Sequence, residues 1–385
     1  MEIYSVGGSV RDELLGLTIA DRDWVVVGAT PAQLLKLGYK PVGKDFPVFL
    51  HPKTREEYAL ARTERKTARG YHGFEFHAAP EVTLEQDLAR RDLTINAIAK
   101  DAAGDLIDPF GGVADLEARV LRHVGLAFAE DPVRILRTAR FAARFDFTIA
   151  PETVKMMRKM VAAGEADALV AERVWQEFAR GLMEHRPSRM FGALKDCGAL
   201  AAVLPELVGR FAGAAGEHTQ ATIDTAAGRG SALAVRFALL AMHADEAAVT
   251  ALCERLRVPQ ECRELALLAA RYHADVRKAA ALDADALLWL LQATDALRRP
   301  ARFMQLLEVC EIDVSGAKGG DFPARERLAA ALAAARAVDA GALAKRARGA
   351  AQIKAQVAQA RRTAIQRAIA DGTAAPKKTV KKGRR

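Results

Sequence analysis

Two aspartates separated by one residue, Asp21 and Asp23, form a pattern that favours metal-assisted phosphate chemistry. The apolar run 24–27 follows them, so the sequence predicts a strand that carries both acids on one face. Gly7 and Gly8 lie just upstream in a predicted turn whose N–H groups can hold phosphate. Paired carboxylates beside such a turn suit two-metal phosphoryl or nucleotidyl transfer. A solvated Asp-Arg-Asp at a strand end beside a simple glycine turn is the alternative.

A second charged group lies in residues 84–98, where the apolar spacing predicts a helix. Arg91 can clamp phosphate as a rigid fork, and Asp92 can accept hydrogen bonds from ribose hydroxyls. Charged side chains are costly to bury, so some of these should face a ligand. Solvent-facing salt bridges on the first half of the helix are the alternative.

A third group follows a predicted helix start at Pro132. Asp131 and Arg134 are three residues apart and therefore neighbours on one helix face. Asp131 can accept from an amino group while Arg134 donates to a ring acceptor, a pattern that C and A offer but U and G do not. Arg137 and Arg140 continue the same edge, and phosphate would relieve their mutual repulsion. Surface ion pairs of little energy are the alternative.

Several shorter elements should position these groups. A hairpin is predicted from its turn residues, and Glu57 on its second strand could be a third metal-binding carboxylate or an exposed strand residue. The segment 63–80 reads as a mobile basic loop, either a plain surface loop or a lid over the site. The other expected features are a strand at 3–6, a helix capped by Ser9, a helix at 30–37, hairpin strands at 46–50 and 56–61, and a helix capped by Asp115 that runs to Leu121.

The first motif, Gly7-Gly8-x-x-Arg11-Asp12 followed by Asp21-x-Asp23, resembles the opening signature of class II tRNA nucleotidyltransferases, the CCA-adding enzymes. The Arg-Arg-Asp-x-Thr-x-Asn-Ala stretch at 90–97 resembles a second motif of that family, and Glu-Asp-x-x-Arg at 130–134 a third. Residues 172–177 are similar to the family's neck segment. The resemblance covers roughly residues 1–210.

This resemblance implies an α/β nucleotidyltransferase head of the polymerase-β-like kind, with a mixed sheet and helices, followed by all-α neck, body and tail domains. It implies CTP and ATP as substrates, the 3′ end of tRNA as acceptor, Mg²⁺ as cofactor and pyrophosphate as product. Asp21 and Asp23 would then be catalytic and hold Mg²⁺. The implied nucleotide-binding residues are Gly8, Arg11, Arg91, Asp92, Asp131, Arg134, Arg137 and Arg140, with Glu57 as a third carboxylate.

We expect four regions. They are a catalytic head at 1–112, a helical neck at 113–210 that selects nucleotide and binds RNA, a helical body at 211–340, and a basic, partly disordered tail at 341–385 with a Lys/Arg run at 376–385.

The body resembles a histidine–aspartate metal phosphohydrolase domain that has lost its metal site. Such a site needs a His, then an adjacent His-Asp pair, then further ligands. Here His218, His243 and His273 each lack a directly following Asp, and a helix would carry His243 and Asp245 to different faces. We therefore expect no metal-dependent phosphatase activity from this region.

Charge is unevenly distributed. The net charge is +9, yet residues from 341 onward hold 13 Lys/Arg against one Asp, so residues 1–340 are slightly acidic. The basic end is either an RNA-contacting or a simply solvated segment.

The sequence contains no apolar run near 18 residues and opens directly into a strand, so we expect no membrane span and no signal peptide. The four cysteines show no metal-like pairing, which favours reduced thiols in the cytoplasm.

Two other functions share parts of this pattern. A bacterial poly(A) polymerase has the same head, but Asp45 lies where that enzyme carries a basic residue, which favours CCA addition. A non-catalytic RNA-binding relative would lack the metal-binding acids, and both Asp21 and Asp23 are present.

Overall fold

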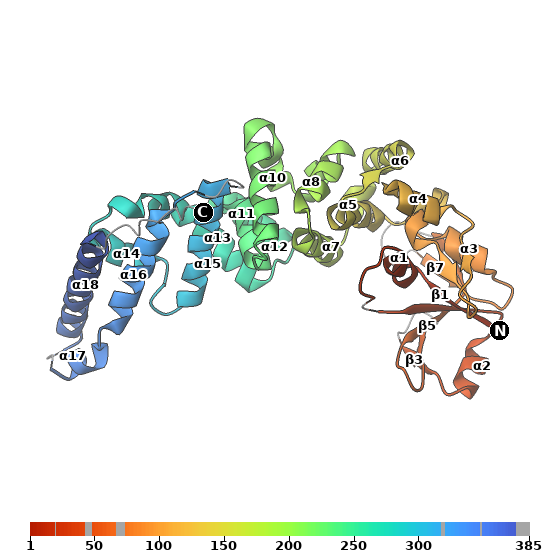
Figure 1. Cartoon of the computed structure of the whole chain (residues 1–385), viewed down its shortest axis with the longest axis horizontal. Coiled ribbons are helices and arrows are strands. Elements are labelled where there is room, and N and C mark those ends of the chain that lie inside the picture. The colour runs from red at the N-terminus through yellow and green to blue at the C-terminus, as the bar shows by residue number, and fades with distance from the viewer. Residues whose placement is uncertain (20, 43–47, 67–73, 317–319, 347–348, 375–385) are drawn as a thin grey trace, which may run out of the picture. The chain divides into compact units, whose positions relative to one another are not determined.

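The structure is a computed structural model that describes residues 1–385 except 20, 43–47, 67–73, 317–319, 347–348 and 375–385. The chain divides into two compact units, Met1–Val208 and Gly209–Arg385, whose elements are labelled in Figure 1. The first unit contains a β-sheet and helices, and the described part of the second is helical. Asp45, the residue that distinguishes the predicted CCA-adding enzyme from a poly(A) polymerase, lies outside the described residues.

A seven-stranded mixed sheet forms the base of the first unit, in the order β3-β4-β5-β2-β1-β8-β9. Its central pair β2–β5 is parallel and every other pair is antiparallel. This mixed sheet, with helices packed on it and helices following it, confirms the predicted fold class. The strands are β1 Glu2–Val6, β2 Asp23–Val27, β3 Lys40–Val42, β4 Val48–Leu50, β5 Glu57–Leu60, β8 Ala99–Lys100 and β9 Leu106–Ile107.

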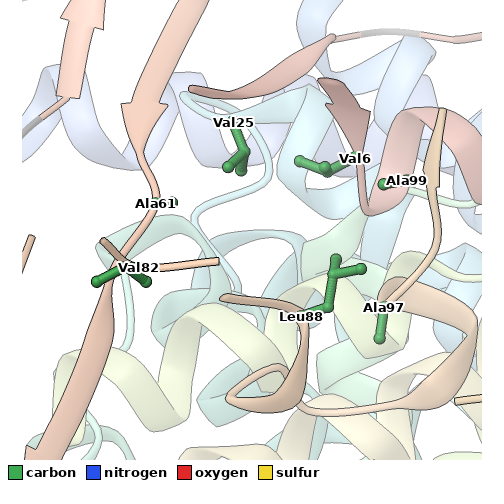
Figure 2. Close-up of a cluster of buried hydrophobic side chains, with 7 residues drawn as sticks. All are labelled: Val6, Val25, Ala61, Val82, Leu88, Ala97 and Ala99. Atoms are coloured by element: carbon green, nitrogen blue, oxygen red, sulfur yellow. The ribbon is translucent and has the colours of Figure 1, made fainter. Parts of the chain in front are cut away.

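Two hydrophobic clusters pack against the sheet. Consecutive strand residues point to opposite faces, and accordingly Val25 joins one cluster while Val26 joins the other. The first cluster appears in Figure 2, where Leu88 of α3 (Leu84–Ala89) lies among short side chains from β1, β2 and β8. The second surrounds Leu34 of α2 (Pro31–Lys36). An apolar cluster therefore packs on each face of the sheet and positions its central strands.

The turn that follows β1 differs slightly from the prediction. Helix α1 spans Gly8–Leu14, and Gly7, with φ +71°, is its N-cap. Ser9 lies inside the helix, where its hydroxyl donates to the Val6 carbonyl at 3.1 Å. The expectation that Ser9 caps this helix is wrong because the chain enters the helix two residues earlier, through a glycine conformation at Gly7.

The helix predicted over 84–98 is wrong beyond Ala89. After α3 the chain makes a short 3₁₀ turn, η1 (Thr94–Asn96), and then enters β8. The Asp92 carboxylate accepts from the Leu93 backbone N–H at 2.9 Å and from Asn96 Nδ2 at 2.8 Å. These local bonds compete with helix hydrogen bonds and turn the backbone.

Asp115 is likewise not a helix cap. It lies within α4 (Gly112–Ala118), whose N-cap is Gly111, and accepts from the Thr94 hydroxyl at 2.6 Å and from Arg122 Nε. Asp115 therefore ties α4 to the turn η1. A Cβ at Gly112 would lie 2.3 Å from the Thr94 carbonyl oxygen, so only glycine permits this approach.

The segment predicted as a basic loop at 63–80 contains two paired strands. β6 (Thr63–Lys66) and β7 (Phe74–His77) form an antiparallel hairpin. The centre of the predicted loop, 67–73, lies outside the described residues.

Helices complete the first unit. The long helix α5 (Val133–Phe145) packs against α7 and α8, so its inner face of Ile135, Leu136 and Ala139 is buried as predicted. Two 3₁₀ turns lie before and after α5, η2 Leu126–Glu130 and η3 Glu165–Ala168, and a third, η4 Pro205–Phe211, spans the division at Val208. The other elements are β10 Val120–Leu121, β11 Thr148–Ile149, α6 Pro151–Ala162, α7 Ala171–Met183, α8 Pro187–Asp196 and α9 Ala199–Val203.

The second unit is all-helical where it is described, as predicted. Its last helix, α18, packs on α14 and α16, so most of the basic C-terminal segment is folded. The predicted disordered run 376–385 lies outside the described residues. No described helix combines the length and apolar character needed to cross a bilayer. The helices are α10 Gly213–Gly228, α11 Leu233–Ala241, α12 Glu246–Arg255, α13 Gln260–Lys278, η5 Ala279–Ala281, α14 Ala284–Ala293, α15 Pro300–Ser315, α16 Pro323–Ala337, α17 Ala340–Arg346 and α18 Ala350–Ala374.

Candidate active site

A pocket of about 400 Å³ lies where β1, β2, the turn at η1 and helices α5 and α7 meet. Six arginines and three aspartates line it, so it carries an excess of positive charge that suits a triphosphate. Most of the predicted site residues lie in this lining; Asp21, Glu57 and Arg140 do not. The lining residues are Gly7, Gly8, Arg11, Asp23, Arg90, Arg91, Asp92, Asn96, Asp131, Arg134, Arg137 and Arg173.

Asp23 begins strand β2 at the edge of the pocket. The strand register places it opposite Val6, the residue before the glycine turn, and opposite Glu57 on β5. Register partners on adjacent strands share a face of the sheet, so Asp23 and Glu57 point the same way.

Asp21 lies two residues before β2, so the expectation that both aspartates belong to one strand is wrong. Both acids are exposed. Among the described residues, one group of three side chains, in the second unit, has its ligand atoms close enough together to hold a metal ion. The carboxylate oxygens of Asp21, Asp23 and Glu57 do not lie as close to one another as the ligand atoms of that group.

The glycine turn allows a guanidinium to approach its backbone. Arg91 Nη1 donates to the Asn96 carbonyl at 3.3 Å, and Arg91 Nη2 pairs with Asp87 at 3.3 Å. A Cβ at Gly7 would lie 2.6 Å from Arg91 Nη1. Glycine is therefore required here twice over, by its positive φ and by the approach of Arg91.

Arg11 contributes a fixed positive charge from beneath the turn. Its guanidinium is buried, with Nε donating to Asp12 Oδ1 at 2.8 Å and Nη1 donating to Asn96 Oδ1 at 2.5 Å. Phe141 and Phe145 of α5 stack on it at 5.1 and 5.0 Å. Burial lowers the pKa of Arg11, and the Asp12 carboxylate partly offsets that effect.

Asp92 is held by donors from two elements. Besides Leu93 and Asn96, Arg137 Nε of α5 donates to its Oδ2 at 2.8 Å. Burial disfavours the charged carboxylate, but Arg137 and the hydrogen bonds outweigh that and hold the pKa of Asp92 well below its usual range. A carboxylate offers about four acceptor positions and three are used, which leaves one for a substrate hydroxyl.

Asp131 is paired with a residue that the sequence reasoning did not assign. Arg173 of α7 binds it as a fork, with Nη1 donating to Oδ1 at 3.2 Å and Nη2 donating to Oδ2 at 2.8 Å. The Val133 backbone N–H also donates to Oδ1 at 3.1 Å. Asp131 too therefore has one acceptor position left, on Oδ2.

Asp131 lies before α5, so the expectation that it and Arg134 share one face of that helix is wrong. Arg134 Nη1 donates to the Ala127 carbonyl at 2.8 Å and its Nη2 donates to the Arg90 carbonyl at 2.7 Å. These bonds fix the plane of the guanidinium beside Asp131 in the pocket lining.

Arg137 and Arg140 carry their own counter-ions. Arg140 Nε donates to Glu177 of α7 at 2.6 Å, and its Nη1 pairs with Glu184 at 3.3 Å. Arg137 Nη1 lies 3.8 Å from Glu177. The expectation that these arginines need external anions is wrong for Arg140, because it pairs with the buried Glu177 on α7 and with the half-buried Glu184 just after that helix.

Three lining residues were left without a role by the sequence analysis: Arg90, Asn96 and Arg173. Each lies inside a stretch that resembles the family, so the resemblance offered a signal. The pairing of Arg173 with Asp131 joins residues 42 positions apart, which periodicity cannot find.

The fold and the pocket define a polymerase-β-like nucleotidyltransferase. Residues 3–122 match the family described as "Poly A polymerase head domain", and residues 146–209 match "Probable RNA and SrmB- binding site of polymerase A". The two matches cover the head and the helices that carry Glu177 and Arg173.

The chain belongs to the family of multifunctional CCA proteins, the CCA-adding tRNA nucleotidyltransferases. It is 55% identical to the "Multifunctional CCA protein" of Paraburkholderia phytofirmans over 96% of this chain and all of that protein. It is 56% identical to the protein of the same name from Chromobacterium violaceum, over 95% of this chain and 97% of that protein. The chain is therefore an enzyme of the nucleotidyltransferase class.

Solved structures agree with this assignment. The Bacillus stearothermophilus CCA-adding enzyme in complex with CTP is 25% identical, with a TM-score of 0.65, covering 96% of this chain and 89% of that one. The Thermotoga maritima CCA-adding enzyme complexed with tRNA has a TM-score of 0.67 at 19% identity, covering 96% and 91%, and supports the fold. Enzymes of this family use a divalent metal.

Proposed function

We propose that this enzyme adds C, C and A to the 3′ end of tRNA from CTP and ATP, releasing pyrophosphate, and that the pocket described above is where it does so. The observation that carries the assignment to this pocket is the convergence of three groups in one cavity. These are the glycine turn with Asp23, the arginine-rich wall, and Asp131 with its one open acceptor position.

Mg²⁺ is the proposed metal, held by Asp21 and Asp23 with Glu57 as a third carboxylate. The donors are oxygen atoms only, which suits a hard cation. Asp23 and Glu57 face the same side of the sheet, and both acids are exposed rather than tied into ion pairs with described residues. When bound, the metal would activate the attacking hydroxyl and stabilise the leaving phosphate oxygens.

The residues of the chain position the two reactants. The arginine wall, with Arg11 and Arg91 nearest the glycine turn, holds the triphosphate by charge and by donated hydrogen bonds. Asp92 accepts from a ribose hydroxyl through its one open acceptor position. The 3′-hydroxyl of tRNA then attacks the α-phosphate in line, forming the new P–O bond as the bond to pyrophosphate breaks.

Base choice rests on Asp131 and Arg134. Asp131 can accept one more hydrogen bond, which matches a single exocyclic amino group on C or A. Arg134, fixed by two backbone carbonyls, donates to the adjacent ring nitrogen. U and G do not present an amino group beside a ring acceptor at that edge, so they leave the fourth acceptor position of Asp131 unfilled.

The other regions follow from this assignment. We assign catalysis to 1–112, nucleotide selection and RNA contact to 113–210, and tRNA binding to the helical body at 211–340 and the basic segment at 341–385. The assigned boundary between the second and third regions, at 210, lies close to the observed division at Val208. The four cysteines are buried and none forms a disulfide with a described residue, which supports a cytoplasmic setting.

The test is extension of tRNA that lacks its 3′ CCA, with each nucleotide alone and then with CTP and ATP together. The account expects two C additions with CTP alone and completion with ATP. Open-ended addition of A without C would instead identify a poly(A) polymerase. Loss of activity on neutralising Asp23, with unchanged folding, would place the reaction in this pocket.

A further inference from the structure

A second charged pocket lies within the unit Gly209–Arg385. It is open, about 560 Å³ in volume, and is lined by Arg210, His218, His243, Arg277 and Asp313 together with small apolar residues. The sequence predicts no metal site here, because no histidine of this region is directly followed by an aspartate. The structure shows that a carboxylate far along the chain, Asp313 on α15, joins two of these histidines.

Asp313 is the centre of the cluster. His218 Nε2 on α10 lies 2.7 Å from Asp313 Oδ1, and His243 Nε2 in the turn after α11 lies 2.8 Å from the same oxygen. Arg277 Nη1 on α13 lies 4.0 Å from Oδ2. Burial would raise the pKa of Asp313, but the two histidines outweigh it and lower the pKa to about 2. Asp313 is therefore negatively charged at neutral pH. Its carboxylate already binds His218 and His243 and lies near Arg277.

These residues fit a phosphohydrolase metal poorly. The position after His243, where such a site carries an aspartate, is Ala244. A carboxylate can only accept, so both histidine Nε2 atoms bear protons in this arrangement and donate to Asp313. A divalent cation would have to displace both protons. It would also face two guanidinium groups with one carboxylate to balance them.

The same features suit an anion. Even with neutral histidines, the two arginines outnumber the single aspartate. Arg277 is half exposed. Arg210 donates through Nη2 to the Thr219 hydroxyl, while its buried Nε has no hydrogen-bond partner among the described residues. A tetrahedral anion between the two guanidiniums would satisfy that donor with charge-assisted hydrogen bonds.

We propose that this pocket is a metal-free binding site for a phosphate group, held by Arg210 and Arg277, with Asp313 orienting His218 and His243. The phosphate is either a backbone phosphate of bound RNA or a free phosphate or phosphomonoester. The proposal is independent of catalysis in the head, because every residue it uses belongs to the second unit. In this proposal the pocket binds an anion, whereas a metal phosphohydrolase would hydrolyse a phosphate ester at the same place.

The test uses the full-length protein with ¹³C-labelled histidine, so that ring signals of His218 and His243 report on this pocket alone. Inorganic phosphate should shift both signals. Arg277→Ala and Arg210→Ala should each weaken that response about tenfold or more, as expected for a lost charge-assisted bond. Arg298→Ala, which removes an arginine that is 82% exposed and outside the pocket, is the matched control and should change nothing.

The source of the phosphate is read from tRNA binding. If it is RNA backbone, Arg277→Ala should lower the slope of log affinity against log salt by about one, and Arg298→Ala should not. An unchanged slope together with a phosphate-induced shift identifies a free phosphate or phosphomonoester. The proposal is overturned if phosphate shifts neither histidine, or if Ni²⁺ or Zn²⁺ binds stoichiometrically and Asp313→Asn abolishes that binding.

Discussion

Replacing Arg173 with alanine should weaken base selection more than overall activity. Arg173 supplies two of the three hydrogen bonds that hold Asp131. Without this fork, the Asp131 carboxylate keeps only the bond from the Val133 N–H and can rotate. The side chains are 29% and 19% exposed, so the pair is partly screened, and we expect a loss near the low end of the range for charge-assisted bonds.

That loss is about 1.4 kcal/mol in the preference for CTP and ATP over UTP and GTP, or about tenfold in the ratio of rates. The assay is single-turnover extension of tRNA lacking CCA with each of the four nucleotides in turn. Arg173→Lys, which keeps the charge but not the fork, should fall between the wild type and Arg173→Ala.

Arg186→Ala is the matched control. Arg186 makes a comparable ion pair with Asp146 at 2.9 Å in the same unit and lies outside the pocket. It should leave the nucleotide preference unchanged. The reasoning is refuted if Arg173→Ala slows all four nucleotides by the same factor, because Arg173 would then support the fold or the triphosphate rather than the orientation of Asp131.

Three further outcomes are expected. Gly7→Ala should cost about 1–3 kcal/mol in urea unfolding and abolish extension, because φ is +71° and the new Cβ would lie 2.6 Å from Arg91; unchanged stability would contradict this. Since the pKa of Asp92 is lowered by folding, its stabilisation is present above about pH 4 and is lost as pH falls; Asp92→Asn should flatten the decline in stability on acidification, and an unaltered pH profile would count against it. Chelation of divalent metal should stop extension and added Mg²⁺ should restore it, whereas full activity in chelator would exclude the metal.

Local pattern predicted much of the first unit. The strand 3–6, the helix predicted from Pro132 and the apolar strand after Asp23 are each defined by short-range periodicity and standard helix-start residues. The structure contains all three, although the helix begins at Val133 and Pro132 is its N-cap. Tertiary contacts decided the failures. The helix predicted over 84–98 stops early because Asp92 gathers its donors from Leu93, Asn96 and the distant α5.

The sites depend even more on contacts between distant residues. Spacing suggested that Asp131 and Arg134 share one helix face, whereas Asp131 lies before that helix and is bound by Arg173 on another helix. In the second unit the expected pattern was an aspartate directly after His243 in the sequence. The acid that contacts His243 is instead Asp313, 70 residues further along the chain. Single-sequence reasoning identifies which residue types can do chemistry, but the pairing of charges across helices requires the fold.

The most direct test of the account is the single-turnover rate of CMP and AMP incorporation by the double variant Asp21→Asn, Asp23→Asn. Both acids are exposed, so the variant should unfold at the wild-type temperature while extension falls below detection at any Mg²⁺ concentration. A folded double variant that still lengthens tRNA at the wild-type rate would contradict the account.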